Sequence, residues 1–232
     1  MTAPRQLVLD LAHRPALAAE DFLVSQANAA AVDMVDRWPD WPQQSVLVVG
    51  PARSGKSHLA NVWRLKSAGE ATLQAAALDE AAVALFQRAK ALVIEDLDRG
   101  VGHERVLFHL LNLAREHKTH LLLTSALAPG DLKITLPDLR SRLRALPVVR
   151  IENPDAELLR AVLVKLFADR QLAVEPHVIA HLGLHMERSM AAAERLVDEI
   201  DRRALAAHRK VTRALAAEVL ASMVSSDGGG PY

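Results

Sequence analysis

The chain lacks cysteine altogether, has very few aromatic residues and carries no excess charge of either sign. Without cysteine it can form no disulfide and has no thiol for catalysis, which fits a reducing compartment. Aromatic residues make up 3% of the 232 residues, so the core must come from Leu, Val and Ala. Basic and acidic residues number 28 each. Because DNA-binding proteins usually show a basic excess, we expect no direct sequence-specific DNA binding.

Long hydrophobic runs and internal repeats are also missing. No apolar stretch approaches the length that a membrane span needs. The apolar part of the N-terminal segment is too short, and the segment too charged, for a signal peptide. We therefore expect a cytoplasmic protein with no membrane partner.

Residues 46–57 read VLVVGPARSGKS, in which four apolar residues lead into the complete P-loop pattern G-x-x-x-x-G-K-S. The apolar run predicts a buried strand, and the pattern predicts a loop and helix start whose N–H groups surround phosphates. Gly50 and Gly55 let the backbone bend, Lys56 would reach the β- and γ-phosphates, and Ser57 would hold Mg²⁺. A chance glycine-rich turn is the alternative. The expected nucleotide contacts are Gly50, Pro51, Ala52, Arg53, Ser54, Gly55, Lys56, Ser57 and His58.

A second apolar run, residues 91–94, ends in the carboxylates Glu95 and Asp96. This is the Walker B pattern, in which a buried strand delivers a carboxylate beside the P-loop to hold Mg²⁺ directly or through water. The alternative is a strand that ends in an exposed acidic turn. Its place downstream of a complete P-loop pattern favours the metal-binding interpretation.

Two further patterns follow along the chain. Residues 121–125, LLLTS, predict a buried strand that ends in the hydroxyls of Thr124 and Ser125. These could orient a water or sense a γ-phosphate, or they could simply cap the next turn. Residues 139–144, LRSRLR, carry three arginines at every second position, which is either a solvated face or an arginine finger that acts on a neighbour's nucleotide site.

The C-terminal part of the chain changes character. Residues 155–225 show four amphipathic helical patterns, so we expect a parallel-sheet α/β base followed by an all-α lid. The predicted parts are a tail at 1–17, a nucleotide-binding α/β base at 18–153, a helical lid at 154–225 and a disordered tail at 226–232.

The N-terminal tail contains the alternating stretch QLVLDL at 6–11, between two prolines. As an extended segment it places Leu7, Leu9 and Leu11 on one face. It is either an edge strand or a short peptide that docks in another protein's apolar pocket, with Gln6 supplying hydrogen bonds.

Taken together, these motifs resemble an AAA+ module, and within that class the replication initiator DnaA. The resemblance covers about residues 20–222 and rests on GPARSGKSHL, LVIEDLD, LLLTS, LRSRL and the Arg188-Ser189 pair. DnaA would continue with a helix-turn-helix domain, which we expect to be absent because few residues follow the lid. This truncation and the QLVLDL tail resemble the DnaA-related Hda family (HdaA in alphaproteobacteria), the regulatory inactivators of DnaA.

The resemblance implies a function and a set of roles. The tail would bind the DNA polymerase sliding clamp (β subunit), and the protein, with ADP rather than ATP in its own site, would promote ATP hydrolysis by DnaA. Arg142 takes the arginine-finger position, Glu95 and Asp96 the Walker B pair, Thr124 or Ser125 the sensor 1 position, and Arg188 could replace a missing sensor 2 arginine. The result would be negative regulation of replication initiation.

Glu95 stands where the wider class usually has Asp, so its carboxylate is displaced by one methylene. We therefore expect the chain's own ATPase to be weak or absent. A homodimer is left open, because an arginine finger suits self-assembly as well as a different partner. Two other functions also fit a P-loop: a helicase loader or remodelling ATPase that works by its own ATP cycle, and a small-molecule P-loop kinase.

The tail generates a direct prediction. The intact chain should bind the sliding clamp, and a version without residues 1–12 should not, as measured by surface plasmon resonance on immobilised clamp. Gln6→Ala combined with Leu9→Ala should match the deletion. Clamp binding that survives both changes would contradict the peptide interpretation.

Overall fold

The computed structural model describes residues 23–207 and 209–227, so the QLVLDL stretch lies outside the described residues. Its contacts divide the chain into an α/β unit, residues 26–152, and a helical unit formed by the residues from Asn153 on together with Leu23–Ser25. Each unit is described by itself.

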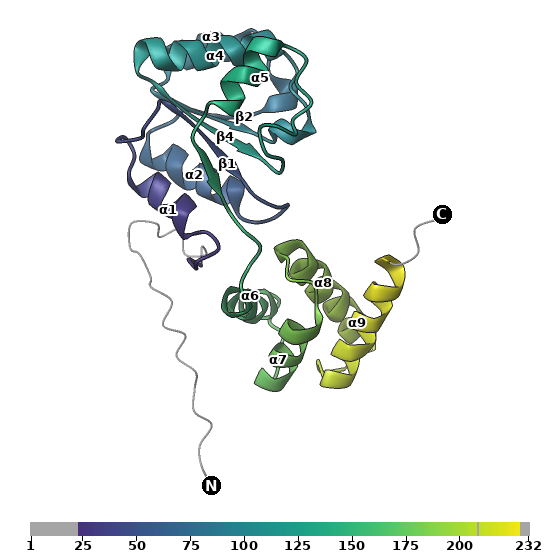
Figure 1. Cartoon of the computed structure of the whole chain (residues 1–232). Helices are drawn as coiled ribbons and strands as arrows, with labels where there is room; N and C mark the ends of the chain where they lie inside the picture. Colours follow the sequence, from purple (N-terminus) through teal and green to yellow (C-terminus); the bar gives the residue numbers. More distant parts are fainter. Residues whose placement is uncertain (1–22, 208, 228–232) are drawn as a thin grey trace. The chain divides into compact units, whose positions relative to one another are not determined.

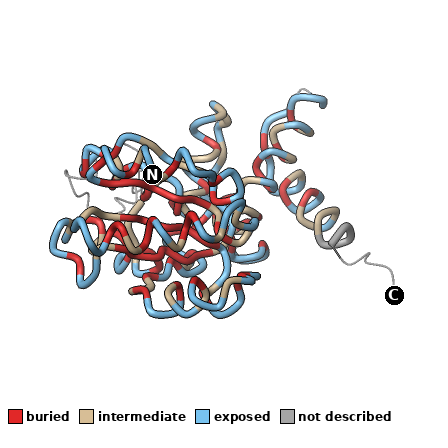
Figure 2. Tube along the Cα trace, turned by 90° about the horizontal axis from the view of Figure 1, so that it is seen from above, coloured by how far each residue is buried: buried red, intermediate tan, exposed pale blue. Residues whose placement is uncertain are grey.

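A five-stranded sheet forms the centre of the α/β unit, in the order β2-β3-β4-β1-β5 with every described pair parallel (Figure 1). Its strands are β1 (Ser45–Val49), β2 (Thr72–Gln74), β3 (Ala91–Glu95), β4 (His120–Ser125) and β5 (Val148–Arg150). The three central strands are buried almost throughout, which explains their unbroken apolar sequences. Figure 2 shows these strands as the continuously buried layer of the unit.

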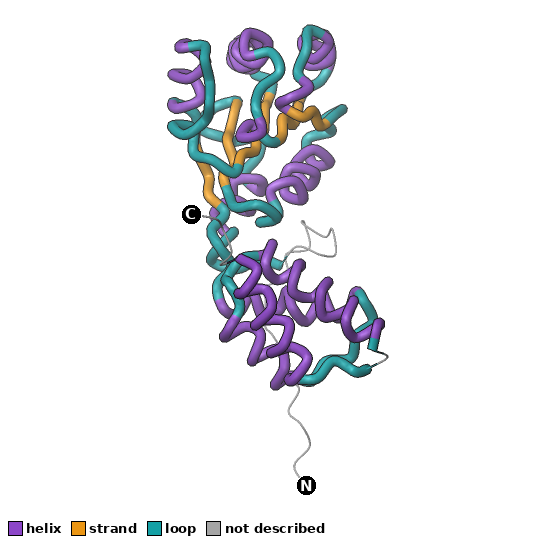
Figure 3. Tube along the Cα trace, turned by 90° about the vertical axis from the view of Figure 1, so that its right-hand side faces the viewer, coloured by secondary structure: helices purple, strands orange, loops and turns teal. Residues whose placement is uncertain are grey.

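Helices cover both faces of this sheet, as Figure 3 also shows. On one face lie α1 (Ala29–Asp36) and α2 (Lys56–Lys66), and on the other lie α3 (Ala81–Arg88), α4 (Glu104–His117) and α5 (Pro137–Arg144). Two short 3₁₀ turns, η2 (Ala75–Ala77) and η3 (Leu97–Arg99), follow β2 and β3. The predicted parallel α/β architecture is confirmed.

The helical unit contains the four expected helices, α6 (Ala156–Asp169), α7 (Pro176–His185), α8 (Met190–Ala206) and α9 (Arg213–Asp227). Their apolar faces share one core that includes Leu159, Leu163 and Ile200. Side-chain caps begin three of them: Asp155 Oδ1 accepts from Leu158 N (2.7 Å), Ser189 Oγ from Ala192 N (3.1 Å) and Thr212 Oγ1 from Leu215 N (3.3 Å). None of the described helices has the length and apolar character needed to cross a bilayer.

All three tryptophans of the chain lie in one cluster of the α/β unit. Trp41 stacks on Trp63 of α2 at 5.1 Å, and Trp38 meets Trp63 edge-on at 6.5 Å. His120, at the start of β4, contacts both loop tryptophans. Burial lowers the pKa of His120, against a hydrogen bond to Pro39 that raises it. The cluster fastens the segment before β1 to the helix that follows it.

One carboxylate ties the long connection between β4 and α5 to the rest of the unit. Glu104, the first residue of α4, accepts hydrogen bonds from Thr135 N (2.8 Å), Thr135 Oγ1 (2.8 Å) and Leu136 N (2.6 Å). Desolvation would raise the pKa of Glu104, but these bonds and the nearby Arg140 together hold the pKa below its ordinary value. The bonds fix the residues that lead directly into α5.

We predict that Glu104→Gln lowers the free energy of unfolding of the α/β unit by about 1–2 kcal/mol at pH 7, since an amide cannot accept three such bonds. Because the folded pKa is depressed, this stabilisation is complete above the unfolded pKa near 4.5 and is lost as the pH falls through the folded value. Urea titrations followed by tryptophan fluorescence, at pH 7 and at decreasing pH, measure both effects. The exposed Glu116→Gln on the same helix is the control, and equal losses in the two variants would contradict the assignment.

Candidate phosphate-binding site

The site is built where the carboxyl ends of three neighbouring strands meet. β1 runs into the P-loop, β3 ends in Glu95, and β4 ends in Thr124 and Ser125. Pairing places Val49 of β1 beside Ser125 of β4, and Gly50 N donates to Ser125 O at 3.1 Å. In open parallel sheets this edge is where ligands bind. The sheet therefore brings the P-loop, the Walker B pair and the hydroxyl pair together.

Glycine is required at both fixed positions of the P-loop. Gly55 caps the N-terminus of α2 with a φ of 94°, a conformation that other residues rarely adopt. A Cβ on Gly50 would lie 2.8 Å from Ser54 Oγ and 2.9 Å from Ile151 O, closer than real contacts allow. Arg53 also has a positive φ, of 62°. The resulting loop turns tightly around the start of α2, whose unpaired N–H groups favour an anion.

Lys56 is buried inside this loop. Its Nζ donates to Gly50 O and to Pro51 O, each at 2.7 Å, and the residue is 7% exposed. Burial lowers the pKa of Lys56, although the negative charges of Asp98, Asp96 and Glu95 oppose this. The ammonium group is thus held beside three carboxylates in a poorly hydrated place, where phosphate oxygens would offset the cost of its desolvation.

Two buried polar atoms at this edge have no hydrogen-bond partner among the described residues. They are Ser54 Oγ in the P-loop and Glu95 Oε1 at the end of β3. The other oxygen of Glu95 accepts from Gln74 Nε2 at 3.3 Å, which orients the carboxylate from the neighbouring strand. Unpaired polar atoms are costly inside a protein, and such atoms commonly mark where a ligand binds. These two fit the polar, charged surroundings of a nucleotide phosphate and its metal.

The structure separates the two hydroxyls at the end of β4. Thr124 Oγ1 accepts a hydrogen bond from Asp96 N at 3.1 Å and so joins β4 to the Walker B turn. Asp96 itself has a left-handed φ of 58°. Ser125 Oγ instead accepts from Leu127 N at 2.9 Å, which is the capping role that the sequence left open. Thr124 is therefore the hydroxyl that contacts the Walker B residues.

Sequence reasoning missed a third carboxylate, Asp98. Asp98 Oδ1 accepts from Ala126 N at 2.6 Å, which connects the turn after β3 to the turn after β4. Among the three carboxylates, Asp98 exerts the largest attraction on Lys56. Arg99 forms an exposed ion pair with Asp96 at 3.3 Å. The spacing in LVIEDLD was the available signal, because Asp98 lies two residues beyond the Walker B pair.

A metal would need ligands from the phosphates as well as from the protein. Within residues 23–207 and 209–227, no three His, Cys, Asp or Glu side chains are grouped as a metal centre. Mg²⁺ typically takes one or two carboxylates and completes its shell with phosphate oxygens and waters. Ser57 in the first turn of α2, with Glu95 and Asp96, provides that partial set, so the residues fit Mg²⁺ bound with a nucleotide.

Other predicted residues lie elsewhere. Arg142 on α5 lines a cavity with Gln43, Gln44 and Ser45, at the start of β1, whereas the P-loop follows the end of that strand. Five residues of strand separate the two places, about 16 Å. Arg188 belongs to the helical unit, immediately before the Ser189 cap of α8, and its contact with a nucleotide stays a prediction.

Comparison with known proteins agrees with this architecture. No protein-family model matches the sequence. The chromosomal replication initiator DnaA of Lachnoclostridium phytofermentans is 26% identical over 145 residues, which is 61% of this chain and 32% of that protein. The chain thus spans about a third of this relative's length.

Solved structures give the fold. Domain III of Thermotoga maritima DnaA superposes with a TM-score of 0.71 at 16% identity, over 90% of this chain and 97% of that one. The chain therefore has the fold of DnaA domain III. AMPPCP-bound DnaA from Aquifex aeolicus gives 0.65 at 19% identity, over 81% and 65% of the two chains. The RuvB branch migration motor of T. maritima gives 0.59 at 15% identity, over 77% and 61%.

We predict that Lys56→Met lowers the affinity of the protein for Mg-ADP and Mg-ATP at least about tenfold, because phosphate loses its buried cationic donor. The melting temperature should not fall much, since methionine removes a charge that burial already disfavours. Isothermal titration calorimetry and calorimetric melting test the two statements. The exposed Lys90→Met, beside β3, is the matched control, and unchanged ADP affinity in Lys56→Met would overturn the assignment.

Proposed function

We propose that this chain is a nucleotide-bound regulatory AAA+ protein that supplies Arg142 to the nucleotide site of DnaA and so promotes ATP hydrolysis by DnaA. The position of Arg142 carries the proposal. Arg142 and the chain's own P-loop lie at opposite ends of β1, which is farther than an arginine side chain reaches. A guanidinium in that place can therefore act only on a nucleotide that is bound to another chain.

The immediate surroundings of Arg142 support its role as a cation that binds a phosphate group of another protein. Its Nη2 donates to Asn112 Oδ1 of α4 at 3.1 Å, which orients the guanidinium and leaves its other donors for a ligand. The helix that carries it is fixed at its start by the bonds to Glu104. Such preorganisation is what transition-state stabilisation by an arginine requires, because the charge must be in place when the phosphoryl group moves.

The chain's own nucleotide has a structural role in this proposal. ADP, with Mg²⁺ held by Ser57, Glu95 and Asp96, would bind the P-loop, and hydrolysis would be weak because Glu95 replaces the usual aspartate. Support comes from the buried Lys56 and from the unpartnered Ser54 Oγ and Glu95 Oε1. The nucleotide complex of Aquifex aeolicus DnaA has the same fold. Clamp binding through Gln6, Leu7, Leu9 and Leu11 completes the proposal.

The decisive experiment is single-turnover hydrolysis by ATP-loaded DnaA, with clamp on DNA and this protein added. Arg142→Ala should reduce the stimulated rate on the order of a hundredfold or more, since arginine fingers supply large factors. Arg144→Ala, on the same helix but outside the cavity, should keep the stimulation. Both variants should still bind the clamp.

Full stimulation by Arg142→Ala would overturn the proposal. So would rapid ATP turnover by the chain alone that disappears in Asp96→Asn, because that result would favour a loader or remodelling ATPase driven by its own cycle.

A further inference from the structure

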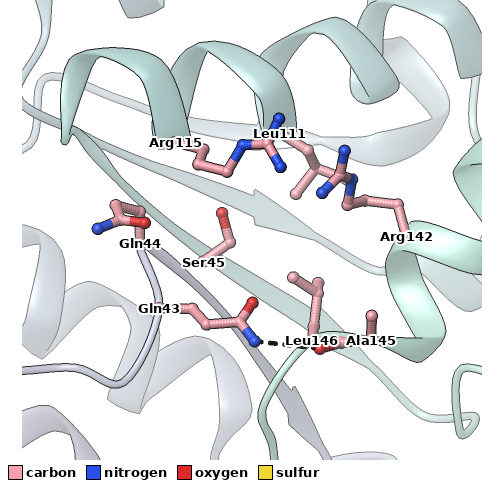
Figure 4. Close-up of a pocket in the computed structure, with 8 residues that line it drawn as sticks. All are labelled: Gln43, Gln44, Ser45, Leu111, Arg115, Arg142, Ala145 and Leu146. Atoms are coloured by element: carbon pink, nitrogen blue, oxygen red, sulfur yellow. Dashed lines mark hydrogen bonds between the residues drawn. The ribbon is translucent and has the colours of Figure 1, made fainter.

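A cavity of about 290 Å³ lies beside Arg142, at the amino-terminal edge of the sheet. Figure 4 shows its walls, which come from the segment before β1, from α4 and from the end of α5. Its lining residues are Gln43, Gln44, Ser45, Leu111, Arg115, Arg142, Ala145 and Leu146. All of them belong to the α/β unit, so the cavity is complete within that unit.

The charge in this cavity is entirely positive. Arg115 and Arg142 line it, and none of the lining residues is acidic. Within the part of the chain that the structure describes, Arg142 bonds only to the neutral Asn112, and Arg115 pairs with no carboxylate. Two guanidinium groups on one small cavity repel each other, and an anion between them would remove that cost.

The hydroxyl of a largely buried residue, Ser45, points into the same space. Ser45 is 5% exposed, and no described residue makes a hydrogen bond with its Oγ. Figure 4 shows this Oγ directed toward the side of the cavity where both guanidinium groups lie. On the opposite wall, Gln43 Nε2 donates to Ala145 O at 3.3 Å, which holds that side chain in place. A hydroxyl on the cavity wall that no described residue bonds, directed toward two cations, is an available donor for a ligand.

We infer that this cavity is a phosphate-binding site, separate from the P-loop, with Arg115, Arg142 and Ser45 as its donors. A phosphate group carries between one and two negative charges near neutral pH, and two cations balance that charge. The two forks and the hydroxyl together offer more donors than one carboxylate can accept, whereas phosphate has three oxygens for them. Phosphate is therefore the ligand class that this cavity fits best.

The inference deepens the proposed function and, for its source of phosphate, rests on it. In that setting the phosphate is the terminal group of the nucleotide that DnaA holds, and Arg115 is a second cation that binds it together with Arg142. Ser45 would orient the phosphate from the side of β1. Binding of phosphate to the isolated chain does not depend on DnaA, and that makes the two statements separable.

The first test measures inorganic phosphate binding to the full chain by ³¹P NMR, in a Lys56→Met background that silences the P-loop. Arg115→Gln should weaken binding about tenfold or more, and Ser45→Ala about threefold or more. Arg144→Gln is the matched control and should bind as the parent does. Melting curves by tryptophan fluorescence check that each variant is folded. No phosphate binding in the parent, or equal binding in Arg115→Gln, overturns the inference.

The second test repeats the DnaA hydrolysis assay with Arg115→Gln and Arg144→Gln. Arg115→Gln should lower the maximal stimulated rate about tenfold. If stimulation requires Arg142 but is unchanged in Arg115→Gln, the role of Arg115 as a second cation is contradicted and the proposed function is not. If the parent binds phosphate through Arg115 and yet never stimulates DnaA, the site stands and the proposed function falls.

Discussion

The parallel pairing of β1 between β4 and β5 is the constraint on which the rest of the α/β unit depends. Because β1 is buried along its whole length, its residues from Val46 to Val49 are apolar up to the point at which the P-loop begins. Its pairing with β4 also aligns Val49 with Ser125, so the loop and the hydroxyl pair arrive at the same edge. The opposite end of the same strand forms one wall of the arginine-lined cavity. One strand thus connects both places where phosphate chemistry is expected.

Electrostatics at the two ends of this strand are opposite in character. At the carboxyl end the buried ammonium of Lys56 and the exposed Arg99 lie near three carboxylates, so negative charge is in excess there. At the amino end two guanidiniums line a cavity without an acid. A magnesium–nucleotide complex suits the first place because it brings its own cation, and a bare phosphate suits the second. The difference follows from the residues that flank β1 and β3 rather than from the sheet itself.

The buried strands and the P-loop could be predicted from the sequence, because apolar runs and glycine spacing each have one simple physical explanation. The apolar runs before Gly50 and Glu95 predicted buried strands, and the glycine spacing predicted the loop. The residue at which an element ends and the direction in which a side chain points could not be predicted. The end of β2 at Gln74 is one example, since Ala75–Ala77 form a 3₁₀ helix. The alternating arginines of 140–144 lie on α5, where residues two apart point in different directions.

The same limit applies to the hydroxyl pair and to the cavity. Thr124 and Ser125 are adjacent and chemically alike, and only the strand's pleat decides which of them faces Asp96. Ser45 and Arg115 are 70 positions apart, and nothing in their local sequence links them. Tertiary packing brings them to one cavity, so they could not be grouped before the fold was known.

The placement of Arg142 and the P-loop at opposite ends of β1 also gives the module a direction. A contact in which the arginine of one chain meets the P-loop of the next, without the reciprocal pair, joins two different surfaces and is heterologous. A twofold dimer would have to bring both ends of β1 into one antiparallel interface, so that each arginine faces the P-loop of the other chain. In the head-to-tail arrangement each chain would have one donor end and one acceptor end, so such a line has a first member and a last.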